Sequence, residues 1–230
     1  MLLQFKNIVK NYGDAVVLQI DEIGINAGEC VGLVGNNGAG KTTAFSLVLD
    51  LIKATKGNVY SKGIDVSEDE SWKKYTAAFL DETFLVDFLT PDEYFDFIGG
   101  LHNWSKADTQ EFVGQFAEFF NGEVLGKKKY IRDLSKGNQK KVGIIGALIG
   151  DPELVLLDEP FASLDPTSQI RLKNLIKERI DRHTFIISSH DLTHVAEVSS
   201  RIIILEQGRL VMDNPKTDQT IVQMTEYFAV

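Results

Sequence analysis

The chain has 230 residues, of which 43% are hydrophobic and 25% are charged. This composition is typical of globular proteins and excludes a disordered chain, a collagen-like fibre and a disulfide-stapled mini-protein. The formal net charge of −9 disfavours nucleic acid as a partner, because its phosphates are bound by clustered Lys and Arg. We therefore expect any bound polyanion to be small and held by a local site.

The single cysteine, Cys30, cannot form an intrachain disulfide and lies in an apolar run. We expect it to be buried as a small hydrophobe, in a protein of a reducing compartment. The first residues do not resemble a signal peptide, and no apolar run approaches the ~20 residues of a membrane span. If the protein works at a membrane, we expect it to act from the cytoplasmic face through a partner.

Strands and helices are predicted in chain order from the apolar pattern. Strands are expected at 18–23, 30–34, 57–60 and 77–80, with a helix from Thr42 to about Lys53. The segment 91–149 has helical spacing, and its aromatic residues indicate packing. Beyond it, the expected strands are 154–157, 184–188, 202–205 and 209–212, with helices at 166–180, from Asp191, and at the C-terminus.

This alternation predicts an α/β fold with a largely parallel sheet, a β-rich N-terminal portion and an inserted helical segment. We interpret the chain as one domain, 1–230, with two lobes. The core lobe comprises about 1–86 and 151–230, and the helical subdomain comprises about 87–150.

The clearest motif is a phosphate-binding loop between a predicted strand and a predicted helix. Its residues are Gly35, Asn36, Asn37, Gly38, Ala39, Gly40, Lys41 and Thr42, followed by Thr43. Glycines let several backbone N–H groups turn inward, and the helix adds its positive N-terminal end. We expect residues 35–43 to bind ATP, with Lys41 at the β- and γ-phosphates and the Thr42 hydroxyl on Mg²⁺.

Two acids follow the apolar strand 154–157. Asp158 stands at the strand end that faces the ligand crevice of open α/β sheets, which favours a Mg²⁺ ligand. Glu159 is then the natural general base for activating a water molecule. The alternative is an acidic turn that merely closes the strand.

Together with these motifs, four further segments resemble the ATP-binding subunit of ABC transporters, a P-loop NTPase family, and the resemblance covers nearly the whole chain. They are Lys10-Asn11-Tyr12-Gly13 (adenine-stacking segment), Leu134-Ser135-Lys136-Gly137-Asn138-Gln139 (signature), Ala162-Ser163-Leu164-Asp165 (D-loop) and Ser188-Ser189-His190-Asp191 (switch histidine).

The resemblance implies a role for each segment. Tyr12 would stack on adenine, although it could be an ordinary strand-end tyrosine. His190 would bind the γ-phosphate as a catalytic residue, although a lone histidine is more often structural. The signature residues Ser135, Lys136, Gly137 and Asn138 would contact ATP held by a second subunit, and Asp165 would couple the two sites.

The chain departs from the family pattern at three positions. Lys136 and Asn138 replace the usual Gly and Gln of the signature, a form that resembles the branch serving simple ABC-2-type exporters. Glu82 stands where the family's Q-loop has Gln; it could bind Mg²⁺, orient water and couple to the membrane subunit, or be a solvated loop acid.

The resemblance implies an ATP-hydrolysing subunit that uses Mg²⁺ and powers a separate membrane permease through ATP-dependent closure of a dimer, most simply a homodimer. One alternative is a soluble ABC-type ATPase of DNA repair, translation or cofactor assembly. Another is a nucleotide-binding regulator with impaired catalysis, motivated by Lys136, Asn138 and Glu82.

Overall fold

A computed structural model describes residues 1–228 of the chain. The strands are β1 (Leu3–Tyr12), β2 (Ala15–Ile25), β3 (Cys30–Val34), β4 (Lys56–Ser61), β5 (Ile64–Asp65), β6 (Thr76–Phe79), β7 (Leu154–Leu157), β8 (Thr184–Ser189), β9 (Arg201–Glu206) and β10 (Arg209–Pro215). The helices are α1 (Lys41–Val48), α2 (Pro91–Leu101), α3 (Lys106–Gly114), α4 (Ala117–Phe120), α5 (Lys136–Gly146), α6 (Pro166–Arg179), α7 (Leu192–Val198) and α8 (Asp218–Phe228). Short 3₁₀ turns are η1 (Ser71–Lys74), η2 (Glu82–Phe84) and η3 (Ile131–Asp133).

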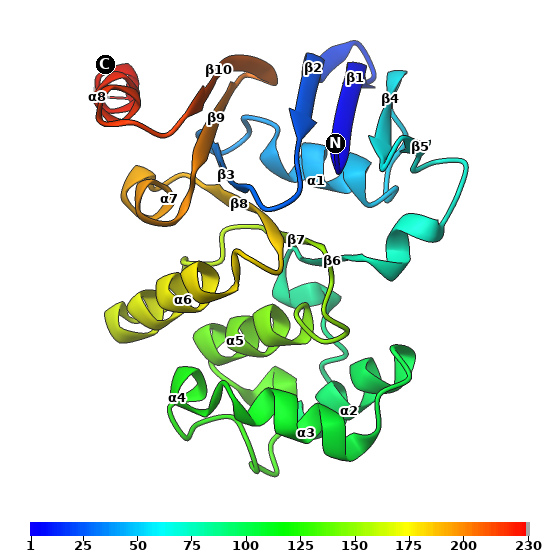
Figure 1. Ribbon diagram of the computed structural model, residues 1–230, viewed down its shortest axis with the longest axis vertical. Helices are drawn as coiled ribbons and strands as arrows, with labels where there is room; N and C mark the ends of the chain where they lie inside the picture. Colours follow the sequence, from blue (N-terminus) through cyan, green and yellow to red (C-terminus); the bar gives the residue numbers. More distant parts are fainter. Residues whose placement is uncertain (229–230) are drawn as a thin grey trace.

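All these strands belong to one sheet of order β5-β4-β1-β2-β10-β9-β3-β8-β7-β6 (Figure 1). Strands β9, β3, β8, β7 and β6 pair in parallel, and β5, β4, β1 and β2 pair antiparallel. Every residue of β3 and β7 is buried, as expected for parallel strands covered on both faces. The predicted α/β fold with an antiparallel N-terminal portion is confirmed.

The central strands lie between two apolar cores. Val155 and Leu157 of β7 pack in the core that includes α5 and α6, whereas Leu154 and Leu156 pack in the core that includes α1 and the N-terminal strands. Successive side chains of a strand point to opposite faces, so one short apolar run serves both cores. Cys30, free and fully buried, belongs to the first core, as expected.

Helix α1 is shorter than predicted. It ends at Val48 instead of about Lys53, and Asp50 adopts a left-handed backbone with φ of 51°. A left-handed residue cannot continue a right-handed helix. The apolar spacing persists beyond the helix because Ile52 still packs against the core from the turn that follows.

Four helices, α2 to α5, lie between β6 and β7 and gather at one end of the molecule (Figure 1). Capping boxes begin α2 at Thr90 and α3 at Ser105. Each of these side chains accepts from the backbone N–H of the N3 residue, and each N-cap backbone N–H donates to the carboxylate of that N3 residue. Phe95, Phe119 and Phe120 are buried, so the predicted aromatic stripe is packing. The proposed bounds of the two lobes stay a prediction.

Helices α6 and α7 follow the parallel strands β7 and β8, and α8 follows β10, which pairs antiparallel with β9. Asp165 caps α6 by accepting from the Ser168 N–H, and Asp191 caps α7 by accepting from the Thr193 N–H. None of the helices within residues 1–228 has the length and apolar content needed to cross a bilayer.

Candidate nucleotide-binding site

The phosphate-binding loop connects β3 to α1, as the motif predicts. Gly40 has a φ of 103°, which L-residues rarely adopt. At Gly35 a Cβ atom would lie 2.3 Å from the Leu205 carbonyl oxygen, so the loop passes too close to β9 for any side chain. Gly40 therefore allows the left-handed turn of the loop, and Gly35 allows the loop to pack closely against β9.

Lys41 is held inside this loop. Its ammonium donates to the carbonyl oxygens of Gly35, at 2.6 Å, and Asn36, at 3.4 Å. It also lies 3.4 Å from Glu159 Oε1. A buried cation needs such acceptors because it has lost its hydration. The loop thus keeps a charged amine beside the space where phosphates would lie.

Thr42 and Asp158 meet at the bottom of the site. Thr42 Oγ1 donates to Asp158 Oδ2 at 2.6 Å, and the Ser188 hydroxyl donates to Asp158 Oδ1. These are the hard oxygen donors that Mg²⁺ prefers, and it usually takes only one or two carboxylates besides phosphate oxygens. The Thr42 and Asp158 oxygens fit Mg²⁺ bound together with a phosphate ligand. Among the described residues, no group of three or more His, Cys, Asp or Glu side chains could hold a metal ion by itself.

Glu159 has an unusual backbone conformation and one carboxylate oxygen that makes no hydrogen bond. Its φ is 46°, in the left-handed region. The Glu159 N–H donates to Ser188 Oγ at 2.9 Å, and its carbonyl accepts from Lys140 Nζ at 2.8 Å. On the side chain, Oε2 lies 2.9 Å from His190 Nδ1, whereas the buried Oε1 has no hydrogen-bond partner. One carboxylate oxygen therefore contacts His190, and the other makes no hydrogen bond and lies beside the Lys41 ammonium.

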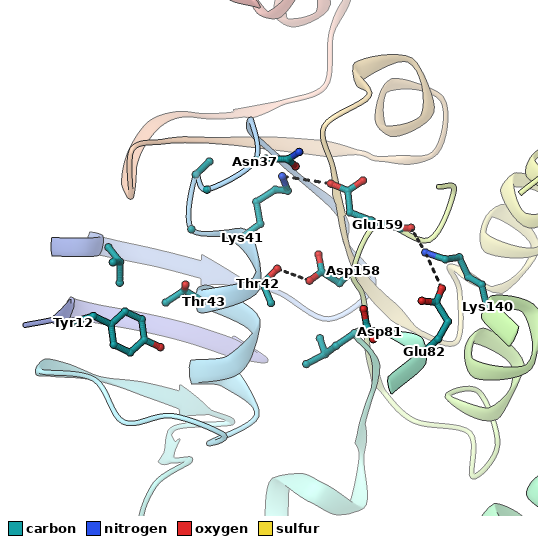
Figure 2. Close-up of a pocket in the computed structure, with 15 residues that line it drawn as sticks. Tyr12, Asn37, Lys41, Thr42, Thr43, Asp81, Glu82, Lys140, Asp158 and Glu159 are labelled. Carbon is teal, nitrogen blue, oxygen red and sulfur yellow. Dashed lines mark hydrogen bonds and ion pairs between the residues drawn. The ribbon is translucent and has the colours of Figure 1, made fainter. Parts of the chain in front are cut away.

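A pocket of about 460 Å³ joins these groups. Figure 2 shows Tyr12 at one end, Glu82 and Lys140 at the other, and Thr42 and Asp158 between them. The lining residues are Tyr12, Val17, Asn37, Gly38, Ala39, Gly40, Lys41, Thr42, Thr43, Leu80, Asp81, Glu82, Lys140, Asp158 and Glu159. Tyr12 is 56% exposed, so its ring is available to a ligand.

Most predicted site residues therefore come together. Gly35 and Asn36 do not line the pocket but hold Lys41, and His190 adjoins it through Glu159. Glu82 begins the turn η2 and lies 3.6 Å from Lys140 Nζ.

The predicted signature and Asp165 lie outside this pocket. Ser135 and Lys136 are exposed at the start of α5, where the Ser135 hydroxyl accepts from the Asn138 N–H. The Asn138 side chain is turned inward and donates to Glu123 Oε2 at 3.0 Å. Gly137 lies so close to the Ser163 carbonyl that a Cβ atom would be 2.8 Å from it.

Asp165 is exposed and caps α6. Hydrogen bonds from the Ser168 hydroxyl and backbone N–H lower the pKa of the Asp165 carboxyl, so that it is ionised at neutral pH. The cap fixes a negative charge on the surface near the start of α6.

Lys140 is a charged lining residue that the sequence motifs do not predict. The other unpredicted lining residues are Val17, Leu80 and Asp81. Lys140 follows the signature on α5 and is only 7% exposed. The signal available in the sequence is that Lys140 and Lys141 directly precede the apolar run 142–149. The structure shows that both lysines are buried. Buried lysines are uncommon without a partner, so such a pair indicates nearby acceptors.

The ABC transporter family profile matches residues 18–162 of this chain. An uncharacterized ABC transporter ATP-binding protein, YhaQ of Bacillus subtilis, is 32% identical over 92% of this chain and 70% of its own length. The chain belongs to the ABC transporter family. The pocket described above is therefore a candidate nucleotide-binding site in a member of this family.

Two further similarities describe the extent of this family relationship. An uncharacterized ABC transporter ATP-binding protein of Synechocystis is 35% identical over 82% of this chain, which spans 54% of that relative's length. A solved dimeric structure, a post-hydrolysis state of an ATP-binding cassette bound to ADP and Pi, has a TM-score of 0.83 at 23% identity. It covers 94% of this chain and 99% of its own, and at this identity it establishes the fold alone.

Proposed function

We propose that this ABC protein is the ATP-hydrolysing subunit of a transporter and drives a separate membrane permease from the cytoplasmic face. The observation that carries the proposal is the convergence of the phosphate-binding loop, Thr42, Asp158 and Glu159 on one pocket. The pocket combines phosphate-binding, metal-binding and base groups, which is what hydrolysis of a nucleoside triphosphate requires.

Substrate binding uses the backbone and the two ends of the pocket. The loop N–H groups and the Lys41 ammonium bind the phosphates, and Tyr12 stacks on the base. Thr42 and Asp158 are the residues that would hold Mg²⁺, which neutralises charge on the β- and γ-phosphates when bound. Glu82 lies in the same pocket, from where its carboxylate can also reach the metal or the water shell.

Glu159 is the proposed general base. Its Oε1 lacks a hydrogen-bond partner and can accept the proton that the attacking water releases. His190 contacts the other oxygen and thereby orients the carboxylate. The His190 side chain is 54% exposed, so it can also approach a γ-phosphate.

A second ATP-binding subunit follows from the position of the signature. Ser135 and Lys136 are exposed at the N-terminal end of α5 and lie outside the chain's own pocket. A helix N-terminus with free N–H groups favours an anion, so we assign these residues to ATP held by a partner copy. Asp165 would couple the two sites, and the dimeric neighbour supports this assembly.

The segment after Glu82 is the proposed permease contact. Phe84 and Phe88 are 63% and 61% exposed, and two neighbouring aromatic side chains are rarely this exposed unless they bind a partner. An apolar segment of a membrane subunit would cover them, and its motion would reach the pocket through Glu82. Family membership supports this partner.

The first experiment replaces the base. Glu159→Gln keeps the shape of the side chain but cannot accept a proton, so ATP turnover should fall by about 10²–10⁴-fold while ATP binding persists. The variant should also accumulate as a dimer with ATP and Mg²⁺ in light scattering. Glu153→Gln is the matched control, because Glu153 is an exposed acid that pairs with Lys62 away from the pocket. Turnover like that of the parent would refute the base assignment.

The second experiment tests the permease. Tagged Glu159→Gln protein should recover a multi-span membrane protein from gently solubilised membranes of its source cells. Adding Phe84→Ser and Phe88→Ser should abolish that recovery, whereas Val222→Ser, at a 54% exposed apolar site on α8, should not. Recovery of soluble proteins alone would favour cofactor assembly or regulation instead.

A further inference from the structure

Lys140 occupies an unusual position for a lysine. Its side chain is 8% exposed, and its ammonium lies at one end of the nucleotide pocket (Figure 2). It donates to the Glu159 carbonyl at 2.8 Å and lies 3.6 Å from Glu82 Oε1. A buried ammonium with two oxygen partners on separate segments links those segments.

The first link restrains the backbone of Glu159. A left-handed φ costs a non-glycine residue free energy and persists only where the surroundings fix it. Ser188 of β8 holds the Glu159 N–H, and Lys140 of α5 holds its carbonyl. The direction of the carboxylate depends on this backbone, so both contacts determine where the base lies.

The second link compensates a charge. Glu82 adds a carboxylate to a pocket that must receive a triphosphate, and its side chain is only 15% exposed. An unpaired, poorly solvated carboxylate there would repel the substrate's charge. Lys140 supplies the neutralising cation directly beside it.

The two links start from the helix that carries the signature. Ser135 caps α5, and Lys140 lies five residues further along the same helix. A displacement of α5 therefore moves the contacts of Glu159 and Glu82 together with the exposed Ser135 and Lys136.

We propose that Lys140 is a positioning residue for ATP hydrolysis: it holds the backbone of Glu159 and neutralises Glu82. The inference rests on the proposed role of Glu159 as base. In this proposal Lys140 is the ion-pair partner of Glu82, so that the two charges in the pocket cancel.

The test is a mutant cycle measured by steady-state ATP hydrolysis. Lys140→Met keeps the length and apolar packing of the side chain but removes both contacts, so kcat should fall by about 10- to 100-fold. The KM for ATP should change by less than about threefold, since the loss concerns the positioning of the base. Lys140→Arg keeps a cation and should lose less.

Glu82→Gln distinguishes a positioning role of Lys140 from a purely structural one, because only a positioning role predicts a change in kcat when the two substitutions are combined. Added to Lys140→Met, it removes the uncompensated carboxylate and should recover part of the lost kcat. The matched control is Lys173→Met with Glu197→Gln, because that pair is also poorly exposed at the lysine, has an Nζ–Oε1 distance of 2.7 Å, and lies outside the pocket. It should alter melting temperature without altering kcat.

Two results would overturn the inference: a folded Lys140→Met protein with the parent's kcat, or a loss of kcat that Glu82→Gln does not relieve. Failure of the proposed function is separate, because it appears in Glu159→Gln, which leaves Lys140 intact.

Discussion

Thr42 Oγ1 donates to Asp158 Oδ2 across 2.6 Å, although 116 residues separate them in the chain. The contact joins the first turn of α1 to the end of β7. Asp158 is 5% exposed and also accepts from Ser188, so each of its carboxylate oxygens accepts a hydrogen bond from a hydroxyl group. These contacts place the hydroxyl groups of Thr42 and Ser188 around one carboxylate at the floor of the pocket.

Removing the Thr42 hydroxyl should weaken Mg²⁺ binding selectively. Thr42→Val keeps the shape of the side chain but lacks the donor, and we expect apparent Mg²⁺ affinity in the hydrolysis reaction to fall by about 10- to 100-fold. The measurement is the ATP hydrolysis rate over a Mg²⁺ titration. Ser46→Ala is the control, because Ser46 on the same helix bonds only the Thr42 carbonyl. An unchanged Mg²⁺ midpoint in Thr42→Val would contradict the assignment.

Tyr12 should contribute to nucleotide affinity through its ring. Stacking of a base on an aromatic side chain contributes about 1–3 kcal/mol, so Tyr12→Ala should weaken ATP binding by that amount. Tyr12→Phe keeps the ring and should bind like the parent. Calorimetry with a slowly hydrolysed ATP analogue measures both variants. Equal affinity of the Ala variant would make Tyr12 an ordinary exposed residue at the end of β1.

Two glycines in helices should respond to alanine with opposite signs. At Gly143 of α5 a Cβ atom would lie 2.1 Å from Phe79 Cε2, and the Phe79 ring is 3% exposed. Gly143→Ala should therefore lower the free energy of unfolding by about 1–3 kcal/mol. Gly100 of α2 faces open space, so Gly100→Ala should raise it by about 0.4–1 kcal/mol. Urea unfolding monitored by circular dichroism tests the pair, and equal effects would contradict the packing of α5 on β6.

Cys30 should be chemically inert in the folded protein. Burial raises the pKa of its thiol to about 12, partly offset by the neighbouring Ser199 side chain and by the positive charge of Lys216. At pH 8 the reactive thiolate is then only about 10⁻⁴ of the folded population, and a thiol reagent should modify Cys30 only after denaturation. Between pH 9 and about 12 the unfolded thiol ionises and the folded one does not, so this group lowers stability as pH rises. Rapid labelling of native protein at pH 8 would contradict this burial.

Local sequence was sufficient for several features of the fold and the site. The strand before Gly35 and the helix after Gly40 were predictable because turn glycines and apolar runs act over neighbouring residues. The same holds for Asp158 at the end of β7. The helix after Gly40 was predicted too long because the left-handed backbone conformation of Asp50, which ends it, was not recognised in the sequence.

The sequence by itself determined that this chain has a phosphate-binding loop, two strand-end acids and an α/β fold, because each depends on short-range patterns of glycine, charge and apolar spacing. Only the tertiary structure decided that Lys140 joins Glu82 to Glu159 and that Asn138 turns toward Glu123. These pairs form between residues of different elements, and their partners are chosen by how the helices pack on the sheet. The sequence specifies the charge and shape of each side chain, but the packing of the folded chain determines which neighbour each side chain contacts.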